Sequence, residues 1–343
     1  MKYFSARLSL WSLVCAAAVA FATGSQASEV NLYSHRHYEI DKQIFADFTA
    51  ATGIKVNVVQ ASADQLIERL KAEGDNSPAD VLFTVDAGRL ERAKAANLLQ
   101  PVTSPVIDKT VPADLRDPDR HWHAVTARAR VIIYSKERVK PSELSTYEDL
   151  ADPKWKGRLL VTSSGSVYNQ SLLASIIEAN GRDAALGWAR GVASNLARAP
   201  QGGDRAQAQA ISAGLADVAI VNTYYIGLLR TSKTAKDRDA GNAVAVFFPN
   251  QDGRGAHINV SGIGVTRSAK NKDNAIKFIE YLISPEAQAR FSENNHEYPL
   301  TLDVNASPVL KDFGAFKADR SAVTKLGPRN SEAVETFNTA GWP

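Results

Sequence analysis

The sequence predicts an α/β protein built from two lobes. Short extended runs alternate with helical patterns along almost the whole chain, an order typical of parallel sheets covered by helices. The same alternation starts again at residue 158, which indicates a second lobe of the same kind. Residues 28–343 are also long enough for two domains of roughly 100 to 200 residues each.

In the first half of the chain, each predicted helix ends at a glycine. The first helix has apolar residues at helical spacing from Ile40 to Phe48, and Gly53 follows it. The second has Leu66, Ile67 and Leu70 on one face and is followed by Gly74. The expected strands of this half are residues 30–33, 54–59 and 79–84.

The second half shows the same signals. A helix with apolar residues from Leu172 to Ile177 ends at Gly181, and another is expected over residues 274–283. Ser284 and Pro285 then mark the start of a further helix, with proline in its first turn. The expected strands of this half are residues 158–162, 217–221, 244–248 and 258–265.

We expect two interleaved lobes. Residues 28–127 with about 255–300 form the N-terminal lobe, and residues 128–254 with about 301–343 form the C-terminal lobe. The extended segments 131–134 and 247–249 are the expected crossings between them. A hinge of this type would let the lobes close on a ligand.

Residues 1–27 have the three parts of a secretory signal. Lys2 and Arg7 precede an apolar run over residues 8–21, and Ser25-Gln26-Ala27 offers a small-residue cleavage site. The run is shorter than the roughly 20 residues that cross a bilayer, so we expect a cleaved signal and a soluble, monomeric periplasmic protein.

Charge and sulfur content exclude several functions. Lys2 and Arg7 are the only charged residues in 1–27, so cleavage changes 40 basic and 37 acidic residues to 38 and 37. A nearly neutral protein without a basic, aromatic-rich run is not expected to bind nucleic acid. Met1 and Cys15 are the only sulfur-containing residues, so the mature chain has no sulfur ligand and no disulfide.

Four tyrosines follow predicted strands, at or near the start of a helix. They are Tyr38, Tyr168, Tyr224 and Tyr225. Open α/β sheets bind ligands at that edge, so the four phenols could meet in one cleft. A lone tyrosine at such a place usually packs, which is our interpretation of Tyr33, Tyr134, Tyr147, Tyr281 and Tyr298.

A cluster of phenols suits a hard, highly charged cation. Phenolate oxygen is a hard anionic donor, and a phenol with a pKa near 10 ionises at neutral pH only where a metal stabilises it. Calcium and magnesium are normally bound by carboxylates and carbonyls. Fe(III) is therefore the expected ligand.

Four phenolates around Fe(III) leave one excess negative charge. Arg128 and Arg36 are the expected compensating cations, and an arginine can also hold a small anion against the metal. Backbone N–H groups of Ser164, Gly165 and Ser166, at a helix start, could donate to that anion.

Five motifs resemble the periplasmic ferric-ion-binding proteins of the FutA and FbpA type, class II solute-binding proteins of ABC iron importers. They are residues 31–38 (NLYSHRHY), 77–81 (SPADV), 146–157 (TYEDLADPKWKG), 200–205 (PQGGDR) and 222–225 (NTYY). The resemblance covers the mature chain and implies a type II two-lobed binding-protein fold. It also implies an ABC permease as partner and no catalysis.

The resemblance also implies a ligand set. The four-tyrosine branch of that family places its iron ligands at Tyr38, Tyr168, Tyr224 and Tyr225, with His37 as an optional or neighbouring ligand. Arg128 corresponds to the arginine beside the metal, and Asn222 lies in the shell around it. Val85 stands where the anion-dependent branch has a glutamate, so an obligatory phosphate is not expected, and carbonate is a candidate synergistic anion.

Other interpretations remain open at this point. The same fold could bind an organic solute such as a polyamine or sugar, with the tyrosines as stacking platforms, or the chain could be a metal-dependent enzyme with an open coordination position. His35 with His37, and His121 with His123, could form zinc or manganese half-sites. We interpret both pairs as solvent-facing or neighbouring histidines, the second in a loop.

Overall fold

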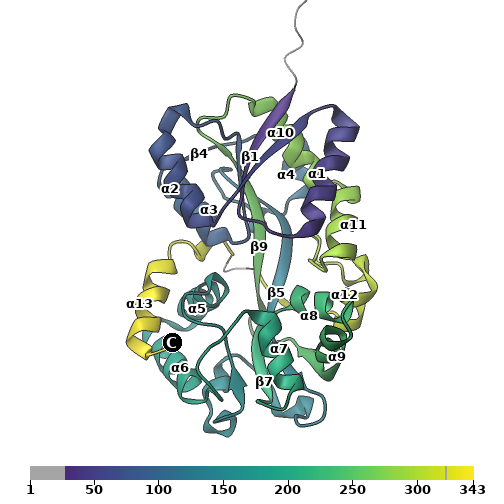
Figure 1. The fold of residues 1–343 in the computed structure, drawn as a ribbon. Coiled ribbons are helices and arrows are strands. Elements are labelled where there is room, and N and C mark those ends of the chain that lie inside the picture. The colour runs from purple at the N-terminus through teal and green to yellow at the C-terminus, as the bar shows by residue number, and fades with distance from the viewer. Residues whose placement is uncertain (1–27, 321–322) are drawn as a thin grey trace, which may run out of the picture.

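The computed structural model describes residues 28–320 and 323–343, so the predicted signal, residues 1–27, lies outside the described residues. Figure 1 shows two lobes, one above the other, with β5 and β9 running between them. The strands are β1 Glu29–Ser34, β2 Lys55–Gln60, β3 Val81–Thr84, β4 Leu99–Gln100, β5 His123–Ser135, β6 Leu159–Leu160, β7 Val218–Asn222, β8 Val244–Phe247, β9 Ala256–Thr266 and β10 Ala318–Asp319.

The helices flank the sheets of both lobes. In the upper lobe, α2 and α3 lie on one side and α1, α10 and α11 on the other (Figure 1). The helices are α1 Glu39–Thr52, α2 Ala63–Glu73, α3 Ala87–Ala95, α4 Pro105–Thr110, α5 Val167–Asn180, α6 Arg182–Ser194, α7 Asp204–Ser212, α8 Thr223–Arg230, α9 Ala235–Ala243, α10 Lys272–Leu282, α11 Pro285–Asn294, α12 Pro308–Phe313 and α13 Asn330–Ala340. Over the described ranges, no helix has the length and apolar character needed to cross a membrane.

The local signals in the sequence explain most of these bounds. Gly53 ends α1 in the left-handed conformation, and its N–H donates to the carbonyl of Thr49. The Ser284 side chain accepts from the N–H of Ala287, with Pro285 in the first turn of α11 as predicted. The expected strand over residues 158–162 is shorter, because only Leu159 and Leu160 pair with β7.

The strand order is β2-β1-β3-β9-β5-β7-β6. β1 is parallel to β2 and β3, and β6 is parallel to β7, as a βαβ order predicts. β9 is antiparallel to β3 and β5, and β5 is antiparallel to β7 and β8. The sheets are therefore mixed, because the strands that join the lobes run against their neighbours.

The crossing segments are β5 and β9, and the two crossings expected from the sequence were wrong in position. From His123 to Ala129, β5 pairs with β9, and from Arg130 onward it pairs with β7 and β8. Residues 131–134 therefore lie within the lower sheet, beyond the crossing. Phe247, at the end of β8, also pairs there, with Ile132.

Tyr147 ties the two crossing strands together where they enter the lower lobe. Its hydroxyl donates to the carbonyl of Arg130 on β5 and accepts from the N–H of His257 on β9 at 3.0 Å. The ring is fully buried, and Trp188 donates to the Tyr147 carbonyl at 2.6 Å. The packing role expected for Tyr147 thus includes two hydrogen bonds to the backbone.

Replacing Tyr147 by phenylalanine should lower the free energy of unfolding by about 1–3 kcal/mol, since a buried carbonyl and a buried N–H lose their partner. Chemical denaturation measures this. Tyr134→Phe is the matched control, because the Tyr134 hydroxyl makes no hydrogen bond within the described part of the chain. That variant should change the free energy by less than about 0.5 kcal/mol. Equal values for the two variants would show that the Tyr147 bridge does not stabilise the fold.

Candidate metal centre

Three helix starts carry the four tyrosines. Tyr38 is the N-cap residue of α1, Tyr168 is the second residue of α5, and Tyr224 and Tyr225 are the second and third residues of α8. Each helix follows a strand, so the rings lie at the ends of β1, β6 and β7. The fold therefore places all four at the junction of the lobes, as the sequence predicted.

The structure brings the four phenols together. The Tyr38 hydroxyl donates to the Tyr224 hydroxyl at 3.0 Å, and the Tyr224 hydroxyl donates to that of Tyr168 at 3.1 Å. The Tyr225 ring lies against the Tyr224 ring with centroids 4.2 Å apart. Tyr38 comes from the upper lobe and the others from the lower one, so the first of these bonds crosses between the lobes (Figure 1).

Burial keeps Tyr38, Tyr224 and Tyr225 protonated in the metal-free protein. Tyr224 is fully buried and Tyr38 is 8% exposed. Burial raises the pKa of Tyr38 and Tyr224 well above the usual value, and the neighbouring Tyr168 raises both further. The pKa of Tyr225 is raised for the same two reasons. Only a strongly charged ligand could ionise such a group near pH 7.

An arginine lies over the ring of each tyrosine. The guanidinium carbon is 4.7 Å from the Tyr38 centroid for Arg36, and 5.9 Å from the Tyr224 centroid for Arg128. Arg130 lies 5.7 Å from the Tyr168 centroid, and Arg205 lies 5.7 Å from the Tyr225 centroid. These are cation–π distances, so four cations surround the phenol cluster.

Three of these arginines are buried and bound to carboxylates. Arg36 pairs with Asp41 at 2.8 Å and with Glu297 at 2.9 Å. Arg128 pairs with Glu297 at 2.7 Å. Arg36 and Arg128, the expected compensating cations, thus lie beside the tyrosines, and each also has a carboxylate partner.

Arg130 is also in an ion pair, with Asp204 at 2.7 Å. Arg205 is exposed, and among the described residues no carboxylate lies within ion-pair distance of it. Arg205 is therefore the one cation over these rings that is not in an ion pair.

Val85 stands at the position where the anion-dependent branch has a glutamate ligand. Its side chain is fully buried and packs with Tyr38 and Tyr224, so the side chain offers no oxygen to the cluster. Its carbonyl accepts from Arg128 at 2.6 Å. The position supports a centre built from phenols.

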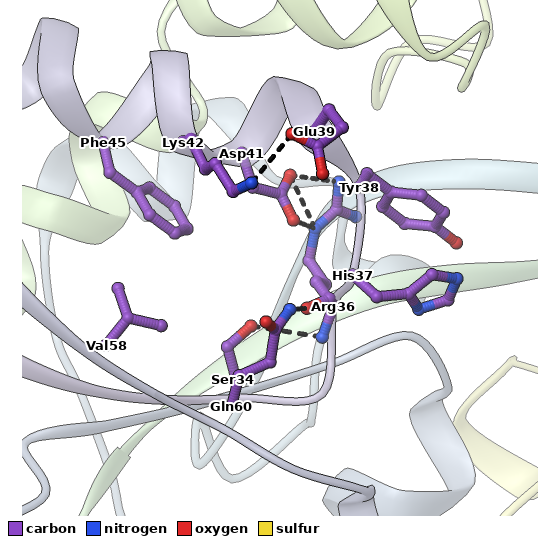
Figure 2. Close-up of a pocket in the computed structure, with 10 residues that line it drawn as sticks. All are labelled: Ser34, Arg36, His37, Tyr38, Glu39, Asp41, Lys42, Phe45, Val58 and Gln60. Carbon is purple, nitrogen blue, oxygen red and sulfur yellow. Dashed lines mark hydrogen bonds and ion pairs between the residues drawn. The ribbon is translucent and has the colours of Figure 1, made fainter.

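His37 lies beside the cluster. Its ring centroid is 4.7 Å from that of Tyr38, and Figure 2 shows the two rings extending to the same side, with the Arg36 guanidinium against Asp41. The side chain is exposed. This position suits the neighbouring role expected for His37.

Two of the three backbone N–H groups expected to bind an anion, at residues 164–166, already have hydrogen-bond partners. The N–H of Ser164 donates to the carbonyl of Pro343 at 2.8 Å, and that of Ser166 donates to Ser163 at 3.0 Å. These two amides are already used, which leaves Gly165 from the expected anion-binding set. Asn222, at the start of α8, is 2% exposed, and its Nδ2 has no partner in residues 28–320 and 323–343.

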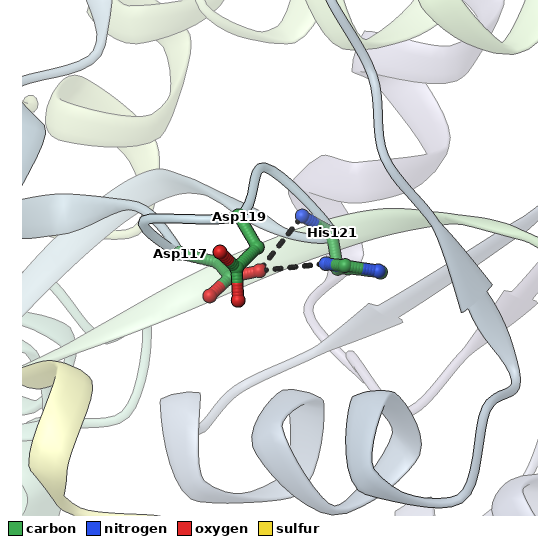
Figure 3. A group of neighbouring side chains, drawn as sticks. All are labelled: Asp117, Asp119 and His121. Carbon is green, nitrogen blue, oxygen red and sulfur yellow. Dashed lines mark hydrogen bonds and ion pairs between the residues drawn. The ribbon is translucent and has the colours of Figure 1, made fainter.

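His121 and His123 lie in different surroundings. His123 begins β5 and is fully buried, so the expectation of a loop holds only for His121. His121 lies with Asp117 and Asp119 in a group of possible metal ligands (Figure 3). The Lys94 ammonium lies 2.5 Å from Asp117 and 2.8 Å from Asp119, so a cation of the protein already occupies this group.

A second contact joins the lobes beside the cluster. Asp86, which follows β3, accepts from the Ser171 hydroxyl on α5 at 2.5 Å and from Asn259 on β9 at 2.6 Å. The other oxygen of Asp86 accepts from the N–H of Arg89 and caps α3. Sequence reasoning missed Asp86 and Ser171, because a capping aspartate and a helical serine are common without a further partner.

Sequence reasoning also missed Glu297, the carboxylate shared by Arg36 and Arg128. Burial would raise the pKa of Glu297, but the two guanidiniums hold it well below its usual range. The residue is therefore ionised although it is fully buried. It lies in a short loop after α11, without a pattern that distinguishes it from a surface glutamate.

Comparison with known proteins fits this geometry. A family model described as bacterial extracellular solute-binding protein matches residues 76–317. The chain is 52% identical to iron uptake protein A1 of Synechocystis over 93% of this chain and 89% of that protein. It is 30% identical to the major ferric iron-binding protein of Neisseria meningitidis over 95% and 96% of the two chains.

Solved structures agree with the sequence matches. FutA (IdiA) of Trichodesmium, in complex with iron and citrate ligands, has a TM-score of 0.88 and 50% identity, covering 92% of this chain and 100% of that one. The ferric binding protein of Campylobacter jejuni has a TM-score of 0.88 and 47% identity over the same shares. The chain therefore belongs to the bacterial extracellular solute-binding proteins, in the FutA and FbpA-type group of periplasmic ferric-ion-binding proteins.

Proposed function

We propose that this protein is the Fe(III)-binding component of an ABC-type iron importer and has no catalytic role. The observation that carries the proposal is the convergence of four phenols from three helix starts on one point between the lobes. Relatives named for iron uptake and ferric-ion binding, which match nearly the whole chain, support the same function.

The proposed ligands are the phenolate oxygens of Tyr38, Tyr168, Tyr224 and Tyr225. Phenolate is a hard donor that matches Fe(III), and the ion's charge would offset the loss of the phenol protons. His37 and Gly165 are proposed neighbours of the metal or of an anion such as carbonate. Buried Asn222, with an amide free to donate, is a further candidate for the anion.

The proposed cycle uses the two lobes. Residues 28–127 with about 255–300 would move as one body, and residues 128–254 with about 301–343 as the other. An open form would capture the ion, and closure would bring Tyr38 onto the three tyrosines of the lower lobe. The importer would then open the lobes to release iron. In this proposal the protein acts as a monomer in the periplasm after loss of residues 1–27.

Adding ferric citrate to the purified protein should produce a visible phenolate-to-iron charge-transfer band. The double variant Tyr224→Phe/Tyr225→Phe should bind iron at least about 100-fold more weakly and lose most of the band, since two ligand oxygens disappear. Absorbance titration against citrate measures both. Tyr134→Phe is the control and should match the wild type. A colourless wild type that is instead stabilised by a polyamine or sugar would refute the proposal and favour the organic-solute alternative.

Acid should weaken iron binding. Burial holds Tyr38, Tyr224 and Tyr225 protonated near pH 7, so binding as phenolates releases at least three protons per iron. The sign follows from mass action: a lower pH opposes the release, and affinity should fall by roughly 1,000-fold per pH unit for three protons. An indicator dye in weak buffer counts the protons, with a chelator blank subtracted. Fewer than two protons per iron would contradict a phenolate centre.

A further inference from the structure

The strongest feature outside the phenols is a closed group of buried charges behind them. Glu297 is fully buried and lies between two arginines that each lie over a different tyrosine. Arg36 lies over the ring of Tyr38, which belongs to the upper lobe, and Arg128 lies over the ring of Tyr224, which belongs to the lower lobe. One carboxylate thus contacts both cations at the interlobe Tyr38–Tyr224 contact.

Glu297 is held in place by a full set of donors. Its Oε1 accepts from Thr126 at 2.8 Å and Arg128 at 2.7 Å, and its Oε2 accepts from Arg36 and from Asn295, both at 2.9 Å. The Ser261 hydroxyl lies 3.3 Å from Oε1 and accepts from both guanidiniums. The carboxylate therefore fixes the position of both arginines relative to β5 and β9.

The charges of this group cancel. Arg36 and Arg128 contribute two positive charges, and Asp41 and Glu297 contribute two negative charges. Arg130 is likewise cancelled by Asp204. These three arginines and their three carboxylates therefore sum to zero charge behind the tyrosines.

The cancelled charges matter for iron binding because the iron-bound centre would itself carry a net charge. Four phenolates around a trivalent ion sum to one net negative charge, so the proposed iron-bound centre is anionic. An added positive charge behind the rings would stabilise the iron-bound form relative to the metal-free form. Each carboxylate in the group removes such a charge.

Resting on the proposed function, we propose that Glu297 sets the ferric-ion affinity of the tyrosine cluster. It holds Arg36 and Arg128 behind the Tyr38 and Tyr224 rings and cancels charge that would otherwise stabilise the bound phenolates. Glu297 is thus a positioning residue that keeps the affinity low enough for iron to be handed on. It does not touch the metal.

The test is Glu297→Gln, which keeps the side-chain shape and removes the charge. It should bind Fe(III) on the order of 10-fold more tightly in competition with citrate at pH 7, with the charge-transfer band at shorter wavelength. The shift is expected because a nearby positive charge lowers the energy of the phenolate electrons. A purely structural role would loosen the site and weaken binding without this shift.

Two further variants sharpen the comparison. Asp41→Asn removes the other carboxylate of the group and should tighten binding by a smaller factor, because Asp41 contacts Arg36 and not Arg128. If Glu297→Gln does not fold, Asp41→Asn tests the proposal in its place. Asp117→Asn is the matched control, since Asp117 is equally buried and paired with Lys94, away from the four tyrosines, and it should leave affinity and band unchanged.

The outcomes separate the two proposals. A wild type that takes up no ferric ion and shows no band overturns the proposed function, and this inference with it. A wild-type band, with affinity in folded Glu297→Gln equal to or weaker than that of the wild type, overturns the inference alone. If only Asp41→Asn folds, iron binding by that variant that is unchanged or weaker than in the wild type likewise overturns the inference alone.

Discussion

The antiparallel pairing of β5 with β9 is the constraint on which the rest of the structure depends. These strands join the lobes (Figure 1), and Arg128 and Arg130 of β5 lie over the rings of Tyr224 and Tyr168. Because side chains alternate along a strand, Thr126, Arg128 and Arg130 lie on one face of β5. Each meets a different part of the centre: Glu297, the Tyr224 ring and the Tyr168 ring.

The elements of the fold could be predicted because their signals are local. Capping serines, terminal glycines and apolar spacing are read within a few residues, and α1, α5 and α11 begin or end close to where such signals stand. The positions of the four tyrosines followed from the same logic, since each helix start was expected at the end of a strand. The crossings were misplaced because a strand that changes partner halfway along its length looks uniform in sequence.

The charge network could not be predicted, because it joins segments that are far apart in the chain. Glu297 is 261 residues from Arg36 and 169 from Arg128. A buried arginine needs a carboxylate partner, but the sequence does not say which of the 37 acidic residues supplies it. The sequence therefore did not indicate that Arg128 is paired with Glu297.

The Tyr147 hydroxyl limits where the proposed closure could bend the molecule. It belongs to the lower lobe and holds β5 at Arg130 and β9 at His257, so below that level the two strands cannot separate from each other or from the lobe. The proposed closure would then bend the stretch just above, where Arg128 and Asn259 are register partners. Residues at a rotation axis move least. In the proposed opening, Tyr38 would therefore separate from Tyr224 and take Arg36 with it, because both residues lie just before α1, while Arg128 would stay near the axis.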